Sequence, residues 1–319
     1  NKLLNLPNSL GQFIVGQEKA IQSISKAIRR ARTGLKNPSK PIGVFLFLGP
    51  TGVGKTELAK VLANYLFSHS DALVKIDMSE FGEKFALSRL VGAPPGYVGH
   101  DEGGELTEKI RRNPYSVVLF DEVEKAHPDL FNIMLQIFDD GVLTDGFGRK
   151  IDFSNTVIIM TSNLGTKELS ASNLGFGELL DSENQKTIEA KIMKSVDNTF
   201  SPELINRIDE NIVFHTLSEN DIFKIIDLQL KDLKENLEKI GLKIRVSISA
   251  KRLLAKRGYK PKYGARPMRR EIQVSIEDYL SEALLKQNFG IGTLIKVDAS
   301  KNQYKFSFIE KSKSSVKKI

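Results

Sequence analysis

A run of residues that is apolar at almost every position, 42–48, leads directly into a glycine-rich turn and then into a helical pattern from about residue 55 to residue 66. A strand without alternating polar residues is buried on both faces, and such strands occur in parallel sheets that helices cover on both sides. A buried strand that feeds a helix is also the repeating unit of α/β folds. This segment therefore predicts a parallel α/β sheet.

Further short runs rich in β-forming residues follow, separated by stretches long enough for helices. They lie at residues 73–76, 116–120, 156–160 and 211–214. Together with the first run they predict five parallel strands. The segment 141–153 has turn residues between apolar ends, which predicts a hairpin.

The pattern changes after residue 215. Ser218 is a typical N-cap for a long charged helix that we expect to reach about residue 240. Further predicted elements are a strand near 244–248, helices near 250–257 and 267–286, and strands at 293–297 and 304–308. We expect a large domain over residues 1–215, a small α+β lid domain over 216–309, and a basic, disordered tail over 310–319.

The net charge of +8 at first suggests nucleic acid, an anionic membrane or a phosphate-rich ligand as a partner. Residues 1–215 contain 24 basic and 27 acidic side chains, whereas residues 216–319 contain 23 and 12, so the basic excess belongs to the small domain and tail. No apolar run approaches the roughly 18 residues of a membrane span. The chain has no cysteine. We expect a soluble protein of a reducing compartment.

The glycine-rich turn fits the pattern G-x-x-x-x-G-K-[ST] and stands between a strand and a helix, the context that gives this pattern its meaning. Glycines allow backbone N–H groups to surround a phosphate chain, and the helix that follows presents its positive N-terminus. The lysine reaches the β- and γ-phosphates, and the hydroxyl of the last residue ligates Mg²⁺. The predicted phosphate-binding residues are Gly49, Pro50, Thr51, Gly52, Val53, Gly54, Lys55 and Thr56.

Two carboxylates, Asp121 and Glu122, follow a four-residue apolar run. Buried carboxylates are costly unless a cation or a reacting water uses them. If this strand lies beside the strand that feeds the phosphate loop, Asp121 is placed to hold Mg²⁺ and Glu122 to take a proton from the attacking water. The alternative is a solvated strand end. Asn163 closes the next strand, where it either orients the water or γ-phosphate or forms a turn.

These motifs occur in the order found in AAA+ ATPases, with Asn206-Arg207-Ile208-Asp209 and Gly264-Ala265-Arg266 after them. The flanking segments 92–99, 125–127 and 143–146 are similar to the second ATPase domain of the Clp unfoldases. The resemblance covers about the first 290 residues. It favours the ClpC type, with the ClpB type next.

The resemblance implies an ATP- and Mg²⁺-dependent site that is completed by a neighbouring copy in a ring, most simply a homohexamer. In this family Arg207 matches the arginine finger that reaches the neighbour's γ-phosphate, and Arg266 matches the sensor arginine of the small domain. Residues 14–17 match the segment that packs against the adenine, with Val15 and Gly16 as the implied binding residues. The implied catalytic residues are Glu122, Asn163, Arg207 and Arg266, and the implied metal ligands are Thr56 and Asp121.

The resemblance also implies functions for two loops. Gly96, Tyr97, Val98 and Gly99 match the pore loop, whose aromatic ring grips an unfolded polypeptide; a tyrosine folded back on its own loop is the alternative. Leu174, Gly175 and Phe176 resemble the loop that docks on a ClpP-type peptidase. Two apolar side chains on a polar loop can equally be packed against their own domain.

The sequence thus predicts an ATPase module that unfolds proteins and threads them through a ring pore, as the regulatory subunit of a ClpP-type protease. The first alternative is a ClpB-type disaggregase without a peptidase. A nucleic-acid-directed AAA+ motor and a non-hydrolysing scaffold are more distant alternatives. The expected location is the cytoplasm, or the stroma of a bacterium-derived organelle, without a membrane or specific nucleic-acid partner.

Overall fold

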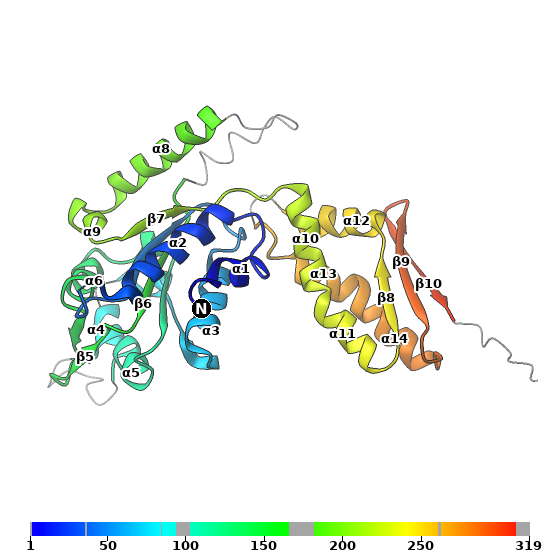
Figure 1. Ribbon diagram of the computed structural model, residues 1–319, viewed down its shortest axis with the longest axis horizontal. Coiled ribbons are helices and arrows are strands. Elements are labelled where there is room, and N and C mark those ends of the chain that lie inside the picture. The colour runs from blue at the N-terminus through cyan, green and yellow to red at the C-terminus, as the bar shows by residue number, and fades with distance from the viewer. Residues whose placement is uncertain are drawn as a thin grey trace, which may run out of the picture. The chain divides into compact units, whose positions relative to one another are not determined.

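The computed structural model describes residues 2–35, 37–83, 85–93, 103–165, 182–260 and 263–310. The chain divides into two compact units, Asn1–Thr216 and Leu217–Ile319 (Figure 1). The predicted pore loop, the predicted docking loop and the tail beyond residue 310 lie outside the described residues. No described helix combines the length and the apolar character that crossing a bilayer requires.

The first unit contains a five-stranded sheet in which all neighbouring strands are parallel, as predicted. In spatial order its strands are β2 (Leu73–Asp77), β3 (Val117–Asp121), β6 (Val157–Ser162), β1 (Gly43–Leu48) and β7 (Glu210–Val213). The condition attached to the roles of Asp121 and Glu122 is not met: β3 does not lie beside β1, because β6 is inserted between them. The carboxyl ends of β3 and β1 nevertheless meet the same sheet edge, with the end of β6 between them.

Both faces of this sheet are covered, as the apolar run predicted. Along β1, Val44, Leu46 and Leu48 belong to one core together with side chains of the helices at 105–112 and 129–140. Phe45 and Phe47 belong to the opposite core together with side chains of the helices at 6–11, 18–30 and 55–67. Since burial of a large apolar side chain contributes about 1.5–3 kcal/mol, the two cores hold β1 and the turn that follows it firmly in place.

The described α-helices of the first unit are α1 (Leu6–Gly11), α2 (Glu18–Arg30), α3 (Lys55–Phe67), α4 (Ala86–Val91), α5 (Glu105–Arg112), α6 (Asp129–Asp140), α8 (Ser182–Thr199) and α9 (Pro202–Asn206). The predicted hairpin is formed by β4 (Val142–Thr144) and β5 (Lys150–Asp152), which pair antiparallel. The helix α3 begins at the end of the glycine-rich turn, so the turn joins the carboxyl end of β1 to a helix N-terminus.

The second unit is a small α+β structure. Its elements are α10 (Glu219–Gln229), α11 (Lys231–Lys239), β8 (Lys243–Val246), α12 (Ile248–Gly258), α13 (Met268–Ile272), α14 (Asp278–Lys286), β9 (Leu294–Ser300) and β10 (Gln303–Ile309). The sheet order is β10-β9-β8, with β9 and β10 antiparallel and β8 and β9 parallel.

The predicted N-cap at Ser218 is confirmed, because Ser218 and Asp221 form a reciprocal capping box. The predicted helix to residue 240 is interrupted, however. Leu230, with ψ of −9°, separates α10 from α11. Charge and apolar spacing continue through this position, so the sequence pattern alone did not reveal the break.

Candidate functional site

The glycine-rich turn has the backbone that its glycines permit. Gly49, Gly52 and Gly54 have φ angles of +132°, +77° and +109°, a region that side chains other than glycine rarely adopt. A Cβ atom on Gly49 would lie 2.5 Å from the carbonyl oxygen of Phe214, so space excludes a side chain there as well. The backbone N–H groups of the loop therefore lie close to the N-terminus of α3. A helix N-terminus with such N–H groups around it binds anions such as phosphate.

The Lys55 side chain is buried, with 7% of the residue exposed. Its ammonium group donates to the carbonyl oxygens of Gly49 and Pro50, the latter at 3.0 Å, and to Oδ1 of Asn163 at 3.1 Å. Burial lowers the pKa of Lys55 to about 8, although the carboxylates of Glu124, Asp121 and Glu122 oppose the shift. A buried cation thus lies against the loop on the side where the strand ends meet.

Asp121 ends β3 and is held from two neighbouring strands. Its Oδ2 lies 2.7 Å from Nζ of Lys75 on β2. Its Oδ1 accepts a hydrogen bond from the hydroxyl of Thr161 on β6. The side chain is only 15% exposed, so its orientation is fixed by these two contacts.

Glu122 has a left-handed backbone, with φ of +59°. For a residue other than glycine this conformation costs about 1 kcal/mol, and such strain is frequent at functional sites. The Glu122 amide donates to Oγ1 of Thr161 at 3.1 Å, and Oε1 accepts from Nδ2 of Asn163 at 3.2 Å. Oε2 forms an ion pair with Lys125. The turn therefore directs the Glu122 carboxylate toward the end of β6.

Asn163 connects the parts of this site. Its Oδ1 accepts from Lys55 and, at 3.3 Å, from Oγ1 of Thr51 in the loop. Its Nδ2 donates to Glu122. One amide group thus joins the buried cation of the loop to the carboxylate after β3, across a sequence separation of 108 residues on the Lys55 side and 41 on the Glu122 side.

Glu124, which sequence analysis did not select, also belongs to this network. Its Oε1 accepts from the backbone N–H of Asn163 at 3.0 Å. Its Oε2 is buried and has no hydrogen-bond partner within the described part of the chain. The pattern Asp-Glu-x-Glu after a buried strand was the available sequence signal.

Gln17 ends the segment that was matched to the adenine, but the contacts that it makes were not predicted. It is 2% exposed, and its Nε2 donates to the carbonyl oxygens of Val53 at 3.3 Å and His215 at 2.9 Å. Its Oε1 accepts from the His215 amide at 3.2 Å. Gln17 therefore ties the phosphate loop to the last residues of the first unit. The preceding residues Val15 and Gly16, predicted to contact a base, are half-buried.

Within the described part of the first unit, Thr56 and Arg207 form no hydrogen bond or ion pair with this network. Thr56 is half-buried in the first turn of α3. Arg207 is 40% exposed and its Nε lies 2.7 Å from Oδ2 of Asp139. Arg266 is exposed and lies in the second unit, directly before Pro267 and α13.

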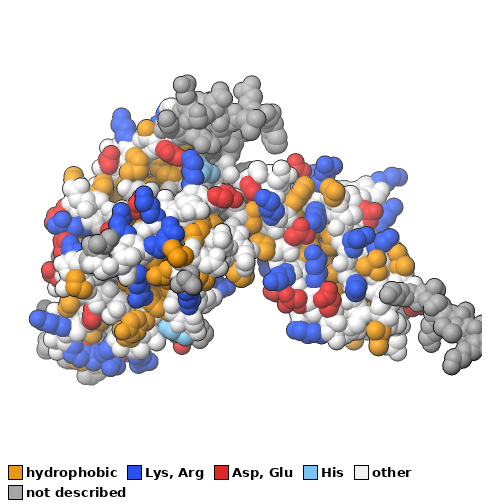
Figure 2. Space-filling model, viewed as in Figure 1, with side chains coloured by type: hydrophobic (Ala, Val, Ile, Leu, Met, Phe, Trp, Pro, Cys, Tyr) orange, Lys and Arg blue, Asp and Glu red, His pale blue; other side chains and the backbone are white. Residues whose placement is uncertain are grey.

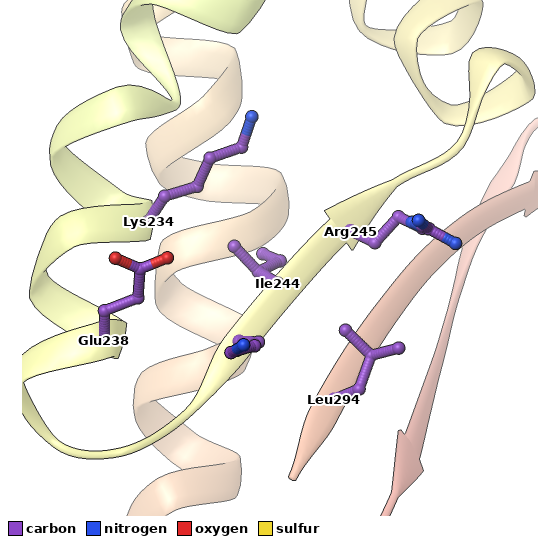
Figure 3. A pocket seen from close by; sticks show the side chains of 6 residues that line it. Lys234, Glu238, Ile244, Arg245 and Leu294 are labelled. Carbon is purple, nitrogen blue, oxygen red and sulfur yellow. The ribbon is translucent and has the colours of Figure 1, made fainter. Parts of the chain in front are cut away.

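A separate shallow pocket of about 360 Å³ lies in the second unit between α11 and the strands β8 and β9 (Figure 3). Its lining residues are Lys234, Glu238, Lys243, Ile244, Arg245 and Leu294. None of them belongs to the predicted site. On the face shown in Figure 2, basic side chains of the second unit are interspersed with acidic ones and do not form one continuous patch.

Comparison with known protein families gives two matches. Residues 40–211 match the model of the AAA domain (Cdc48 subfamily), and residues 217–297 match the C-terminal D2-small domain of ClpB protein. The first match includes the phosphate loop, the carboxylates after β3 and Asn163.

Individual relatives are similar over nearly the whole chain. An "ATP-dependent Clp protease ATP-binding subunit ClpC" of Staphylococcus saprophyticus is 52% identical over 315 residues, which is 98% of this chain and 38% of the relative. The protein of the same description from Staphylococcus aureus (strain USA300) is 53% identical over 312 residues, again 98% of this chain and 38% of the relative. The chain thus spans well under half the length of these relatives.

The predicted resemblance to the Clp group is confirmed by these matches. The chain belongs to the AAA ATPase family, as a Clp-type AAA domain followed by a D2-small domain of the ClpB kind.

Proposed function

We propose that this chain is the ATP-hydrolysing module of a Clp-type protein unfoldase, which threads polypeptide through the pore of a ring of its own copies. The observation that supports this most is the placement of Asn163 between Lys55 and Glu122. An amide that contacts both cannot move without changing both contacts. A phosphate chain at Lys55 is thereby linked to the carboxylate that would activate water.

Within this proposal, nucleotide binding uses the phosphate loop, with Val15 and Gly16 at the adenine. Among the described residues no group of three or more His, Asp or Glu side chains is arranged to hold a metal ion. Two protein ligands are enough for a Mg²⁺ ion that arrives with the nucleotide, because Mg²⁺ commonly takes one or two protein ligands and completes its shell with phosphate and water oxygens. Thr56 and Asp121 would supply the protein ligands, and the ion would neutralise developing phosphate charge.

The chemistry assigned to the protein is a proton transfer and charge stabilisation. Glu122 accepts the proton of the attacking water, and Asn163 orients that water against the γ-phosphate. Arg207 of one copy stabilises the phosphate held by the next, so turnover depends on assembly. Arg266 would couple loss of the γ-phosphate to a rotation of the second unit.

Proton uptake on ATP binding is expected near pH 8.5. The pKa of Lys55 is lowered to about 8 without ligand, so the side chain loses its proton as the pH rises through that value. A polyphosphate favours the protonated form and raises the pKa again. Binding therefore takes up a proton, and affinity falls as the pH rises above about 8, by at most tenfold per pH unit. Calorimetry in two buffers of different ionisation enthalpy measures the uptake.

The matched control is Lys60→Arg, which changes an exposed lysine of the same helix and should leave proton uptake unaltered. At pH 8.5 the phosphates of ATP are already fully ionised, so they contribute no proton change of their own. Equal binding heats in both buffers would contradict the proposed contact between Lys55 and the phosphates.

Substrate threading is proposed to depend on Tyr97, with Gly96, Val98 and Gly99 supplying its loop. We expect Tyr97→Ala to keep at least half of its ATPase activity and to lose most unfolding of a tagged fluorescent protein, because the aromatic grip is removed while the nucleotide site is intact. Tyr115→Ala is the control, since Tyr115 is a tyrosine of the same unit and is 53% exposed. Unfolding by Tyr97→Ala at the wild-type rate would show that the grip lies elsewhere.

Delivery into a ClpP-type peptidase is proposed because the named relatives are described as ATP-binding subunits of Clp protease. Leu174 and Phe176, on either side of Gly175, would dock on that partner. The second candidate, a ClpB-type disaggregase, is favoured by the match of the second unit to the D2-small domain of ClpB protein.

Co-sedimentation with a bacterial ClpP-type peptidase separates these two functions. Wild-type chain is expected to bind, and the double change Leu174→Ala and Phe176→Ala to abolish binding without altering ATPase activity. Absence of binding by the wild-type assembly would favour the disaggregase. We place the module in the cytoplasm of a bacterium, or the stroma of a bacterium-derived organelle, since the relatives compared are bacterial.

A further inference from the structure

The guanidinium of Arg207 is held by a carboxylate of its own chain. Nε of Arg207 lies 2.7 Å from Oδ2 of Asp139, and Nζ of Lys40 lies 3.2 Å from Oδ1 of the same carboxylate. Burial raises the pKa of Asp139, but the hydrogen bonds from Lys40 and Arg207 outweigh it, so the pKa is lowered from its ordinary value. Two cations therefore share one fixed anion.

The backbone on both sides of this contact is anchored. Asp209, two residues after Arg207, accepts from the Val44 amide through Oδ2 at 2.8 Å and donates its own amide to the Val44 carbonyl at 2.9 Å. Ser201 caps α9, the short helix that ends immediately before Arg207. The backbone next to Arg207 is thus fixed to β1, so movement of the guanidinium requires rotation of the Arg207 side chain.

The carboxylate is anchored as well. Gly141, with φ of +64°, ends α6 in a left-handed cap, and a Cβ atom there would lie 1.8 Å from the carbonyl oxygen of Ser39. This close approach holds the last turn of α6 against the segment that carries Lys40. Asp139 therefore presents its carboxylate from a position that the backbone defines.

The contact is poorly suited to a purely stabilising role. The side chains of Arg207, Asp139 and Lys40 are 40%, 31% and 33% exposed, and ion pairs at such exposure contribute little to folding. Its geometry suggests another use. A carboxylate on Nε engages one edge of the planar guanidinium, while the two terminal nitrogens form another edge that can pair with two phosphate oxygens. Among the described residues, Asp139 is the only acidic side chain that forms an ion pair with Arg207.

We propose that Asp139 is a positioning residue, which holds the Arg207 guanidinium by Nε so that its terminal nitrogens are presented to the nucleotide of the neighbouring copy. Lys40 fixes the orientation of the carboxylate. The inference rests on the proposed role of Arg207 and adds to it a second residue that acts from the same chain. Its effect is entropic and geometric: it limits the directions that a flexible side chain samples before the phosphate is met.

The test is a steady-state ATPase titration of Asp139→Ala and Asp139→Asn, alone and combined with Arg207→Ala, at concentrations where light scattering shows assembly. We expect kcat to fall about tenfold in Asp139→Ala while KM for ATP stays within about twofold, because a misdirected guanidinium affects the transition state more than nucleotide binding. In the Arg207→Ala background, Asp139→Ala should have no further effect. Asp140→Ala, an exposed neighbour on α6, is the control and should match wild type.

The outcomes separate this inference from the function on which it rests. If Arg207→Ala hydrolyses ATP normally, the finger assignment itself is wrong. If Arg207→Ala is impaired but Asp139→Ala and Asp139→Asn are both normal, only the positioning role is overturned. Equal losses from Asp139→Ala with and without Arg207, or loss of assembly in both Asp139 variants, would likewise overturn it, because the carboxylate would then act through something other than the guanidinium.

Discussion

Glu122→Gln is expected to reduce ATP turnover about a thousandfold while leaving ATP binding intact, a loss within the range for removal of a general base. Gln keeps the size of the side chain and the oxygen that accepts from Nδ2 of Asn163 at 3.2 Å. It cannot accept a proton from water at neutral pH. Steady-state hydrolysis measures turnover, and calorimetry or a fluorescent nucleotide measures affinity, which should change by less than about threefold.

Glu57→Gln is the matched control. Glu57 is an exposed carboxylate in the first turn of α3, so this variant removes the same charge close to the phosphate loop but outside the Asn163 network. It should hydrolyse ATP at close to the wild-type rate. Unchanged hydrolysis by Glu122→Gln would refute the assignment of the general base, and Glu124, whose Oε2 is buried nearby, would be the next carboxylate to test.

The sequence predicted those parts of the fold that depend on local pattern. The uninterrupted apolar run of β1 predicted burial on both faces, and its side chains do alternate between two cores. The glycines of the turn predicted the backbone that Gly49, Gly52 and Gly54 adopt. Strand positions were correct to within a few residues, because turn-forming residues mark where each β-rich run begins and ends.

Strand order was not predictable in this way. The position of β6 between β1 and β3 depends on how helices cross over the sheet, not on any residue in the strands themselves. This order matters for the site, since it is the end of β6 that supplies Thr161 and Asn163 between the loop and the carboxylates. The residues at the end of β6 therefore connect the carboxylates after β3 to the phosphate loop after β1.

The contacts of Gln17 and Glu124 were missed for a related reason. Gln17 bonds to His215, 198 residues away, and nothing near either residue indicates the pairing. Glu124 contacts the backbone of Asn163 across 39 residues. Both side chains form hydrogen bonds with backbone groups that are brought near them only by folding. Motif spacing therefore predicts the reactive residues better than it predicts the residues that hold the reactive ones in position.

Arg207→Ala is expected to lower turnover about a thousandfold in an assembly made only of this variant, the lower end of the effect of an arginine finger. Arg207 contacts Asp139 within its own chain and none of the described residues of the phosphate-loop network, so its proposed action requires a second copy. Arg30→Ala is the control, because Arg30 is also an exposed arginine in an ion pair, with Glu210. It should retain wild-type hydrolysis and assembly.

Mixing variants tests whether the arginine acts on the neighbouring copy. A Glu122→Gln chain lacks the base but has the arginine, and an Arg207→Ala chain lacks the arginine but has the base. In a randomly mixed ring, about a quarter of the sites combine an intact base with an intact arginine from the next copy, because each interface joins two different surfaces of the chain. Hydrolysis should therefore rise well above that of either variant alone. A mixture no more active than its components, with assembly intact, would place the action of Arg207 within its own chain.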